Sequence, residues 1–199
     1  MNHPAANGCV FCTRAENPTP LFETPTLYAM PDKFPLVPGH TLIVSKEHLA
    51  CYGAADPETL RELDDAAATV RRFLRAAYGL PVVTWENGVS GQSVFHAHLH
   101  LIPLPSDAVP PAVAEHAEVA PIRGWDDVRG HYVQHRCYRY LEVAERRHLV
   151  PGYSPALGPF TGWLATVTGL EYGSRGWIKN TTPDDVREVR RRWQDWQGT

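Results

Sequence analysis

The chain has no apolar run long enough to cross a membrane, and residues 1–8 lack the hydrophobic core of a secretory signal. Its formal net charge is only −3, which gives no overall attraction to nucleic acid or to an anionic membrane. The 4 cysteines do not form the pattern of a secreted disulfide framework. These absences favour a globular, cytoplasmic protein, and the hydrophobic content of 43% agrees with that class.

Histidine is the most informative residue type in this sequence. The chain holds 10 histidines, and His96, His98 and His100 alternate within residues 95–102. A period of two predicts one β-strand with the three imidazoles on one face. The residues expected on the other face are Phe95, Ala97, Leu99 and Leu101. A neutral imidazole is a good nucleophile and a metal ligand, so the run indicates catalysis or metal binding.

The sequence around this run predicts the α+β class. Short strands are expected at 20–32, 40–46 and 81–86. Asp56 and Pro57 form a helix start, and an apolar stripe continues to about Tyr78 before Gly79. Strands, one long helix and further strands predict an antiparallel sheet covered by that helix.

Three motifs carry a resemblance to a known family. They are CVFC at 9–12, PLVPGHTLIVSKEH at 35–48 and GQSVFHAHLH at 91–100. In this order and spacing they resemble the histidine triad (HIT) superfamily of nucleotide hydrolases and transferases. The resemblance implies a HIT domain over residues 1–106. It also implies a homodimer built by joining two sheets.

The resemblance assigns the catalytic residues to the triad strand and the turn before it. His98 is the expected nucleophile, which attacks an α-phosphate and forms a nucleotidyl-histidine intermediate. We expect a backbone carbonyl to hold the other ring nitrogen of His98. The residues expected to complete the catalytic set are His96, His100, Gln92 and Ser93. No metal is demanded at this step, because histidine performs the covalent chemistry.

Substrate contacts are expected on both sides of the triad. Asp32 stands where the family has a residue that binds ribose hydroxyls, and Asn87 occupies a phosphate-side position. His40 matches a histidine that supports the triad from a neighbouring strand. The apolar residues that we expect near the base are Phe11, Leu27 and Met30.

A metal site is expected at the N-terminus. Cys9 and Cys12 alone are half of a zinc site. Similar HIT proteins complete the set with histidines that match His48 and His96. Such a Cys2His2 set would hold a structural zinc that ties the N-terminus to the triad.

The residues from 107 to 199 have no family resemblance. Alternation predicts a strand at 138–143, and helices are expected at 157–170 and 183–196. Five of the 6 tryptophans lie in this extension, so it can bury a large aromatic area. We expect an α/β extension that docks on the HIT domain.

The predicted function is nucleotide hydrolysis or nucleotidyl transfer at the α-phosphate of an adenosine-type nucleotide. The substrate class stays open between a phosphoramidate, an anhydride and a dinucleoside polyphosphate. Two alternatives also stay open: a biosynthetic nucleotidyltransferase with a dedicated acceptor, and a non-catalytic nucleotide-binding protein. The acidic balance disfavours nucleic acid as a partner.

Overall fold

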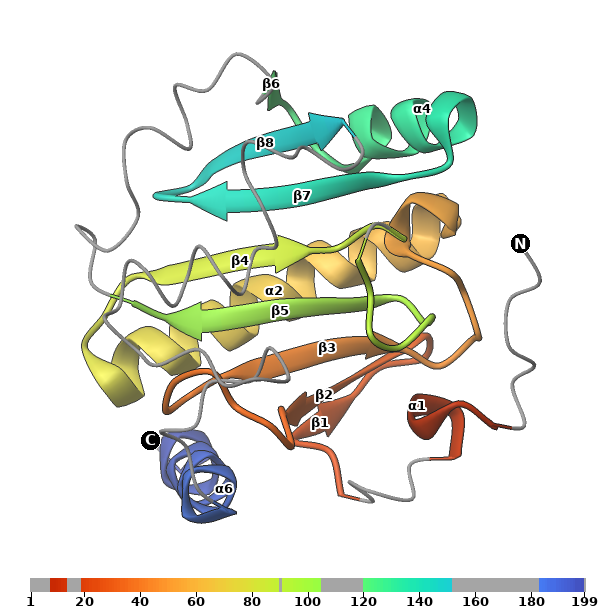
Figure 1. The fold of residues 1–199 in the computed structure, drawn as a ribbon. Helices are drawn as coiled ribbons and strands as arrows, with labels where there is room; N and C mark the ends of the chain where they lie inside the picture. The colour runs from red at the N-terminus through yellow and green to blue at the C-terminus, as the bar shows by residue number, and fades with distance from the viewer. Residues whose placement is uncertain (1–7, 14–18, 90, 105–119, 152–182, 199) are drawn as a thin grey trace, which may run out of the picture.

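The computed structural model describes residues 8–13, 19–89, 91–104, 120–151 and 183–198. Within these residues, one 8-stranded antiparallel sheet has the strand order β1-β2-β3-β5-β4-β7-β8-β6 (Figure 1). The expected α+β class is confirmed.

The elements have the following bounds. The strands are β1 (Phe22–Glu23), β2 (Leu27–Pro31), β3 (Thr41–Ser45), β4 (Val82–Glu86), β5 (His98–Pro103), β6 (Ala120–Ile122), β7 (Tyr138–Val143) and β8 (Arg146–Pro151). The helices are α1 (Val10–Thr13), the 3-10 helix η2 (Tyr52–Ala54), α2 (Pro57–Tyr78), α4 (Trp125–His135) and α6 (Pro183–Gln197). Among the described helices, none combines the length and apolar character that a membrane crossing requires.

Helix α2 forms where the sequence predicts it. The Asp56 carboxylate accepts hydrogen bonds from the backbone N–H groups of Glu58 (2.8 Å) and Thr59 (3.0 Å), which caps the first turn. Gly79 ends the helix with φ of 66°, a left-handed conformation that suits glycine. Its apolar stripe, buried against the sheet, includes Leu60, Leu63, Val70, Phe73 and Leu74.

Helices cover one face of the sheet, and His98 and His100 lie on the other. Helices α2, α4 and α6 all contribute to the main apolar core, which lies on one side of the sheet. Along β2, Leu27 and Ala29 point into that core, whereas Tyr28 and Met30 join a smaller apolar cluster on the other side. The expectation that Leu27 lines a base pocket is therefore wrong, because strand alternation turns it to the helix-covered face.

The extension continues the sheet instead of standing apart. Strand β7 pairs with β4, with Thr84 opposite Glu142 and Glu86 opposite Tyr140, and β8 pairs with β7. The predicted strand at 138–143 and the terminal helix are confirmed, while β8 and α4 were not expected. The helix expected at 157–170 lies outside the described residues.

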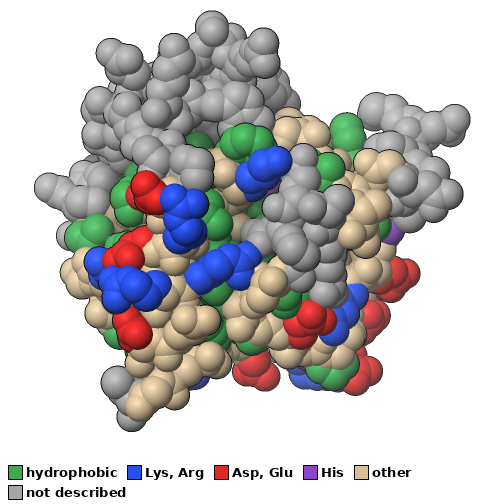
Figure 2. All heavy atoms as spheres, turned by 90° about the horizontal axis from the view of Figure 1, so that it is seen from below, with side chains coloured by type: hydrophobic (Ala, Val, Ile, Leu, Met, Phe, Trp, Pro, Cys, Tyr) green, Lys and Arg blue, Asp and Glu red, His purple; other side chains and the backbone are tan. Residues whose placement is uncertain are grey.

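The surface seen from below in the orientation of Figure 1 carries mixed charges. Lys and Arg side chains lie beside Asp and Glu there (Figure 2). On α6, Arg191 pairs with Glu188 (2.7 Å) and Asp195 (2.9 Å), and Arg187 pairs with Asp184. Arg187 and Arg191 therefore lie on a solvated face where neighbouring carboxylates offset their charge.

A buried polar network joins the extension to the rest of the chain. The Tyr138 hydroxyl donates to Glu86 Oε2 (2.5 Å) and accepts from the Gly53 N–H (2.7 Å). The other oxygen, Glu86 Oε1, accepts from the Tyr52 N–H (2.7 Å). Burial raises the pKa of Glu86 to about 7. The extension is therefore held by specific hydrogen bonds in addition to strand pairing.

We predict that Tyr138→Phe lowers the free energy of unfolding by about 1–3 kcal/mol, because it removes the partner of two buried polar groups. Urea unfolding at pH 7 measures the change. Tyr78→Phe is the matched control, since the buried Tyr78 hydroxyl has no hydrogen-bond partner among the described residues. Equal effects of the two substitutions would contradict specific docking through Tyr138.

Candidate active site and metal centre

The strand that carries the triad is shorter than the alternation predicts. Strand β5 begins at His98, and His96 lies in the loop before it. The Ala97 carbonyl accepts from the Ser45 N–H at the end of β3 (3.1 Å), but the Ala97 N–H donates to the Leu49 carbonyl (2.7 Å) in the segment after β3, which interrupts the regular strand pairing. Phe95 is 37% exposed and does not pack in the core. The expectation of one strand over 95–102 with three imidazoles on a single face is therefore wrong at its first three residues.

The ring of His98 has a defined proton position. Its Nδ1 lies 2.6 Å from the backbone carbonyl oxygen of His96, so Nδ1 carries the proton and donates it. This is the carbonyl partner expected from the sequence. Burial lowers the pKa of His98, which keeps the ring neutral. The result is an Nε2 atom with an available lone pair, the atom that a histidine nucleophile uses.

His100 receives its proton position from His40. The Leu36 N–H donates to His40 Nδ1 (3.1 Å), so His40 carries its proton on Nε2. That atom lies 2.9 Å from His100 Nδ1 and donates to it, which leaves the His100 proton on Nε2. Burial lowers the pKa of His40 to about 3 and that of His100 well below its usual value. Both rings are neutral, and His100 is a hydrogen-bond donor toward the site.

Asp32 lies beside these two histidines. Its Oδ1 accepts from the Phe34 N–H (2.8 Å), and its Oδ2 is 3.4 Å from His40 Nε2. Burial raises the pKa of Asp32 to about 7. The ligand atoms of Asp32, His40 and His100 are close enough for a metal ion. The proton on His40 Nε2 removes the lone pair that a metal would need, so these residues fit a hydrogen-bonded relay better than a metal site.

Trp85 packs against the ring of His100. No sequence motif indicated this contact. The indole lies flat on the His100 ring, with a centroid distance of 4.3 Å and an interplanar angle of 2°. The register of β4 and β5 places the two residues directly opposite each other. The stack fixes the plane of the imidazole.

Of the three residues expected near the base, Phe11 lies beside His98, and Met30 belongs to the apolar cluster against which Phe11 packs. That cluster lies on the face of the sheet that carries His98 and His100. The Phe11 ring centroid is 5.1 Å from that of His98. Tyr28 holds this part of α1 in place by donating to the Phe11 carbonyl (2.8 Å). Phe11 therefore places apolar surface beside His98.

The turn between β4 and β5 carries the expected phosphate-side residues. Asn87 follows the last residue of β4, and Ser93 is exposed. Gln92 is buried, and its Nε2 donates to the Ala50 carbonyl (2.9 Å), so this side chain also holds the turn. At Gly88 a Cβ would lie 2.6 Å from Tyr138, which only glycine avoids.

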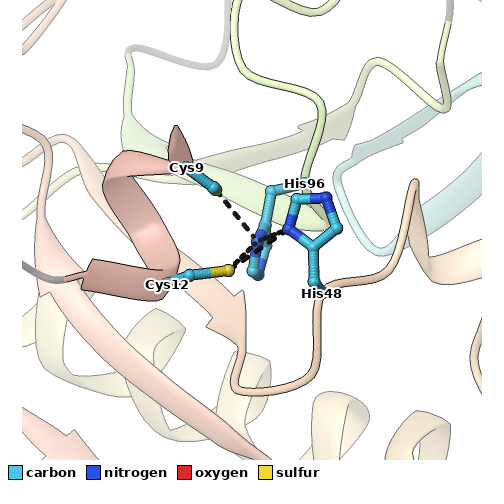
Figure 3. Close-up of side chains that lie close together, drawn as sticks. All are labelled: Cys9, Cys12, His48 and His96. Atoms are coloured by element: carbon cyan, nitrogen blue, oxygen red, sulfur yellow. Dashed lines mark hydrogen bonds between the residues drawn. The ribbon is translucent and has the colours of Figure 1, made fainter. Parts of the chain in front are cut away.

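Four side chains converge into a candidate metal centre (Figure 3). Cys9 directly precedes α1 and Cys12 lies in it, while His48 follows β3 and His96 precedes β5. The two Nδ1 atoms are 3.2 Å apart, and three sulfur–nitrogen distances are 3.2, 3.4 and 3.5 Å. A tetrahedral zinc separates such ligand atoms by roughly 3.3–3.8 Å. The four residues can therefore hold a metal ion.

The surroundings of this cluster suit a metal. His96 Nε2 lies 2.7 Å from the Ser45 carbonyl oxygen and donates to it, which leaves Nδ1 unprotonated for coordination. Burial lowers the pKa of His96 to about 4, so the ring is neutral. Burial and the neighbouring Cys9 raise the pKa of Cys12 to about 11. A bound cation would lower this pKa, because it stabilises the thiolate.

The sequence of the chain is similar to proteins of a known family. The HIT domain model matches residues 14–107. An uncharacterized 16.1 kDa HIT-like protein of Mycoplasma pneumoniae is 35% identical over 106 residues, which cover 50% of this chain and 73% of that protein. The chain belongs to the HIT family. The extension after residue 107 lies outside the family match.

Two further HIT relatives give context. Adenylylsulfatase HINT3 of Arabidopsis thaliana is 29% identical over 103 residues, which cover 49% of this chain and 52% of that protein. The crystal structure of a HIT-like protein involved in cell-cycle regulation from Bartonella henselae is 25% identical. It covers 62% of this chain and 96% of that chain, with a TM-score of 0.44.

The hydrogen bonds predict which ring nitrogen carries the proton in His98, His40 and His100. Long-range proton–nitrogen NMR at pH 7 should show His98 protonated on Nδ1, and His40 and His100 protonated on Nε2. His40 should stay neutral near pH 5, because burial lowers its pKa to about 3. A His98 ring with its proton on Nε2 would contradict the proposed nucleophile orientation.

Proposed function

We propose that this HIT protein is a nucleotide hydrolase or nucleotidyltransferase that acts at the α-phosphate of an adenosine-type nucleotide. The observation that carries the proposal is the 2.6 Å contact of His98 Nδ1 with the His96 carbonyl, which leaves Nε2 as a neutral nucleophile. The relative named adenylylsulfatase HINT3 supports an adenylyl group as the part transferred.

The reaction takes place in two displacements. His98 Nε2 attacks the α-phosphorus and forms an N–P bond, while the bond from phosphorus to the leaving group breaks and the leaving group keeps its electron pair. The hydrogen bond from Nδ1 to the His96 carbonyl stabilises the positive charge on the substituted ring. Water, or an acceptor hydroxyl, then attacks phosphorus and gives up a proton, and the N–P electron pair returns to Nε2.

The other residues bind and orient the nucleotide in this proposal. His100 donates from Nε2 to a phosphoryl oxygen or to the leaving group, and His40 acts as a positioning residue through His100. Asp32 accepts hydrogen bonds from ribose hydroxyls, and the apolar surface of Phe11 and Met30 receives the base. The donors assigned to the phosphate are Asn87, Gln92 and Ser93.

Replacement of His98 by alanine should lower turnover of adenosine phosphoramidate or adenylyl sulfate by at least about 10³-fold, because the covalent step disappears. The substitution His148→Ala is the matched control. His148 is also buried and lies on β8, on the same face of the sheet. Mass analysis of the products separates hydrolysis from transfer. Turnover by a folded His98→Ala protein would reject the proposal.

We further propose that the cluster of Cys9, Cys12, His48 and His96 holds a structural zinc. Four protein ligands close the coordination shell, which is the pattern of structural and not catalytic zinc. The ion would join α1 to the two loops that flank the sheet. When bound, it would supply cross-linking and no reaction step.

Purified protein should contain about one zinc per chain. Cys12→Ser should lose the metal and lower the melting temperature by more than about 5 °C, because metal binding is coupled to folding. Cys137→Ser, outside the cluster, is the control and should keep the metal. A metal-free wild-type protein whose melting is unaffected by added zinc would retire this proposal.

We also propose how the extension affects the assembly of two chains. The family resemblance implies a homodimer formed by joining two sheets, but β7 of the same chain occupies the edge of β4. We propose that the HIT domain (1–106) and the extension (107–199) form one folded unit. A dimer that joins two sheets would then use β1 or β6, the end strands of the described sheet.

A further inference from the structure

The extension places one arginine on the catalytic face of the sheet. On β7, Tyr138 and Tyr140 point into the main core, so Arg139 points to the opposite face. Leu141 is on that face too, opposite Trp85, which stacks on His100. Arg139 therefore shares a face with the histidines.

The register of the sheet places Arg139 on the strand next to β4, which in turn pairs with the strand of His98. The pairing of β4 with β7 continues beyond Glu86, because the Tyr138 N–H donates to the Gly88 carbonyl (3.0 Å). This register puts Arg139 opposite Asn87, two residues beyond Trp85, which pairs with His100 of β5. Strand β4 lies between β5 and β7, so two strand spacings, roughly 10 Å, separate β7 from the strand that carries His98. An arginine side chain covers most of that distance.

The guanidinium reaches the turn that precedes the triad. Arg139 Nη2 lies 3.9 Å from the position that a Cβ on Gly91 would take. Gly91 directly precedes Gln92 and Ser93, the residues assigned to the phosphate. The side chain is buried, with 7% of its surface exposed. The extension thus brings a cation to the phosphate-side turn.

The acidic residues of the same two strands point the other way. Glu86 accepts from Tyr138 in the helix-covered core, and Glu142 pairs with Arg71 of α2 (3.0 Å). Arg139 is therefore the one charged side chain that β4 and β7 place on the catalytic face. An arginine remains protonated throughout the neutral pH range.

We propose that Arg139 binds a negatively charged leaving group, so that the enzyme prefers nucleotides that release an anion such as sulfate, pyrophosphate or a nucleotide. This inference rests on the proposed function at His98. The guanidinium fork binds phosphate-type oxygens in a bidentate manner. When the bond to phosphorus breaks, the leaving oxygen keeps the electron pair, and Arg139 stabilises its charge. A neutral amine leaving group gains nothing from Arg139.

The test is a substrate comparison on Arg139→Met. We expect kcat/KM to fall about 10- to 100-fold for adenylyl sulfate and diadenosine tetraphosphate, as for loss of a charge-assisted hydrogen bond. For adenosine phosphoramidate the change should stay within about threefold. Arg139→Lys keeps the charge but loses the bidentate guanidinium group. Its kcat/KM for the substrates with anionic leaving groups should lie between those of wild type and Arg139→Met. Arg146→Met, at an exposed position on β8, removes the same charge and should leave all three rates unchanged.

A binding measurement keeps this test independent of turnover. In a His98→Ala background, calorimetry compares the affinities for ATP and AMP. The extra phosphates should favour ATP, and Arg139→Met should remove that difference. Wild-type turnover of none of the three substrates would reject the proposed function alone. An equal loss on all three substrates, or an ATP preference that survives Arg139→Met, would overturn the role of Arg139.

Discussion

The site depends on one hydrogen bond, from His98 Nδ1 to the main-chain carbonyl of His96 (2.6 Å). It fixes the tautomer of His98. The imidazole of the same residue, His96, points into the cluster with Cys9 and Cys12. Anything that holds the His96 ring therefore also holds the carbonyl that orients His98. A metal ion held by this cluster would therefore act on the orientation of His98 through the main chain of His96.

The extension contacts the turn that leads to the triad histidines, through strand β7. Strand β7 covers the edge of β4 and its Tyr138 contacts the turn at Gly88, so the loop that leads to the triad is enclosed by residues outside the family match. An unpaired edge strand is a template for association with other chains, and β7 removes that exposure from β4. The extension thus stabilises the turn, and Arg139 adds a positive charge beside it.

Local patterns were enough to predict the elements with strong local signals. The cap at Asp56 and the left-handed Gly79 define α2, and alternation defines β7. The position of His96 was not predictable, since backbone pairing of Ala97 with the segment after β3 decides it. Trp85 lies in a strand that is buried on both faces, so its partner depends on register. Arg139 depends on pairing between strands more than 50 residues apart in sequence, a relation that no local motif encodes.

The central claim is a covalent bond from His98 Nε2 to phosphorus. A single-turnover reaction with adenylyl sulfate, quenched in alkali and mapped by peptide mass spectrometry, tests it most directly, because phosphoramidate bonds survive base. We expect an adenylyl group on the peptide that contains His98, attached to that residue and released on the time scale of turnover. An adduct on another residue, or rapid turnover with no adduct at any time, would contradict the covalent role of His98.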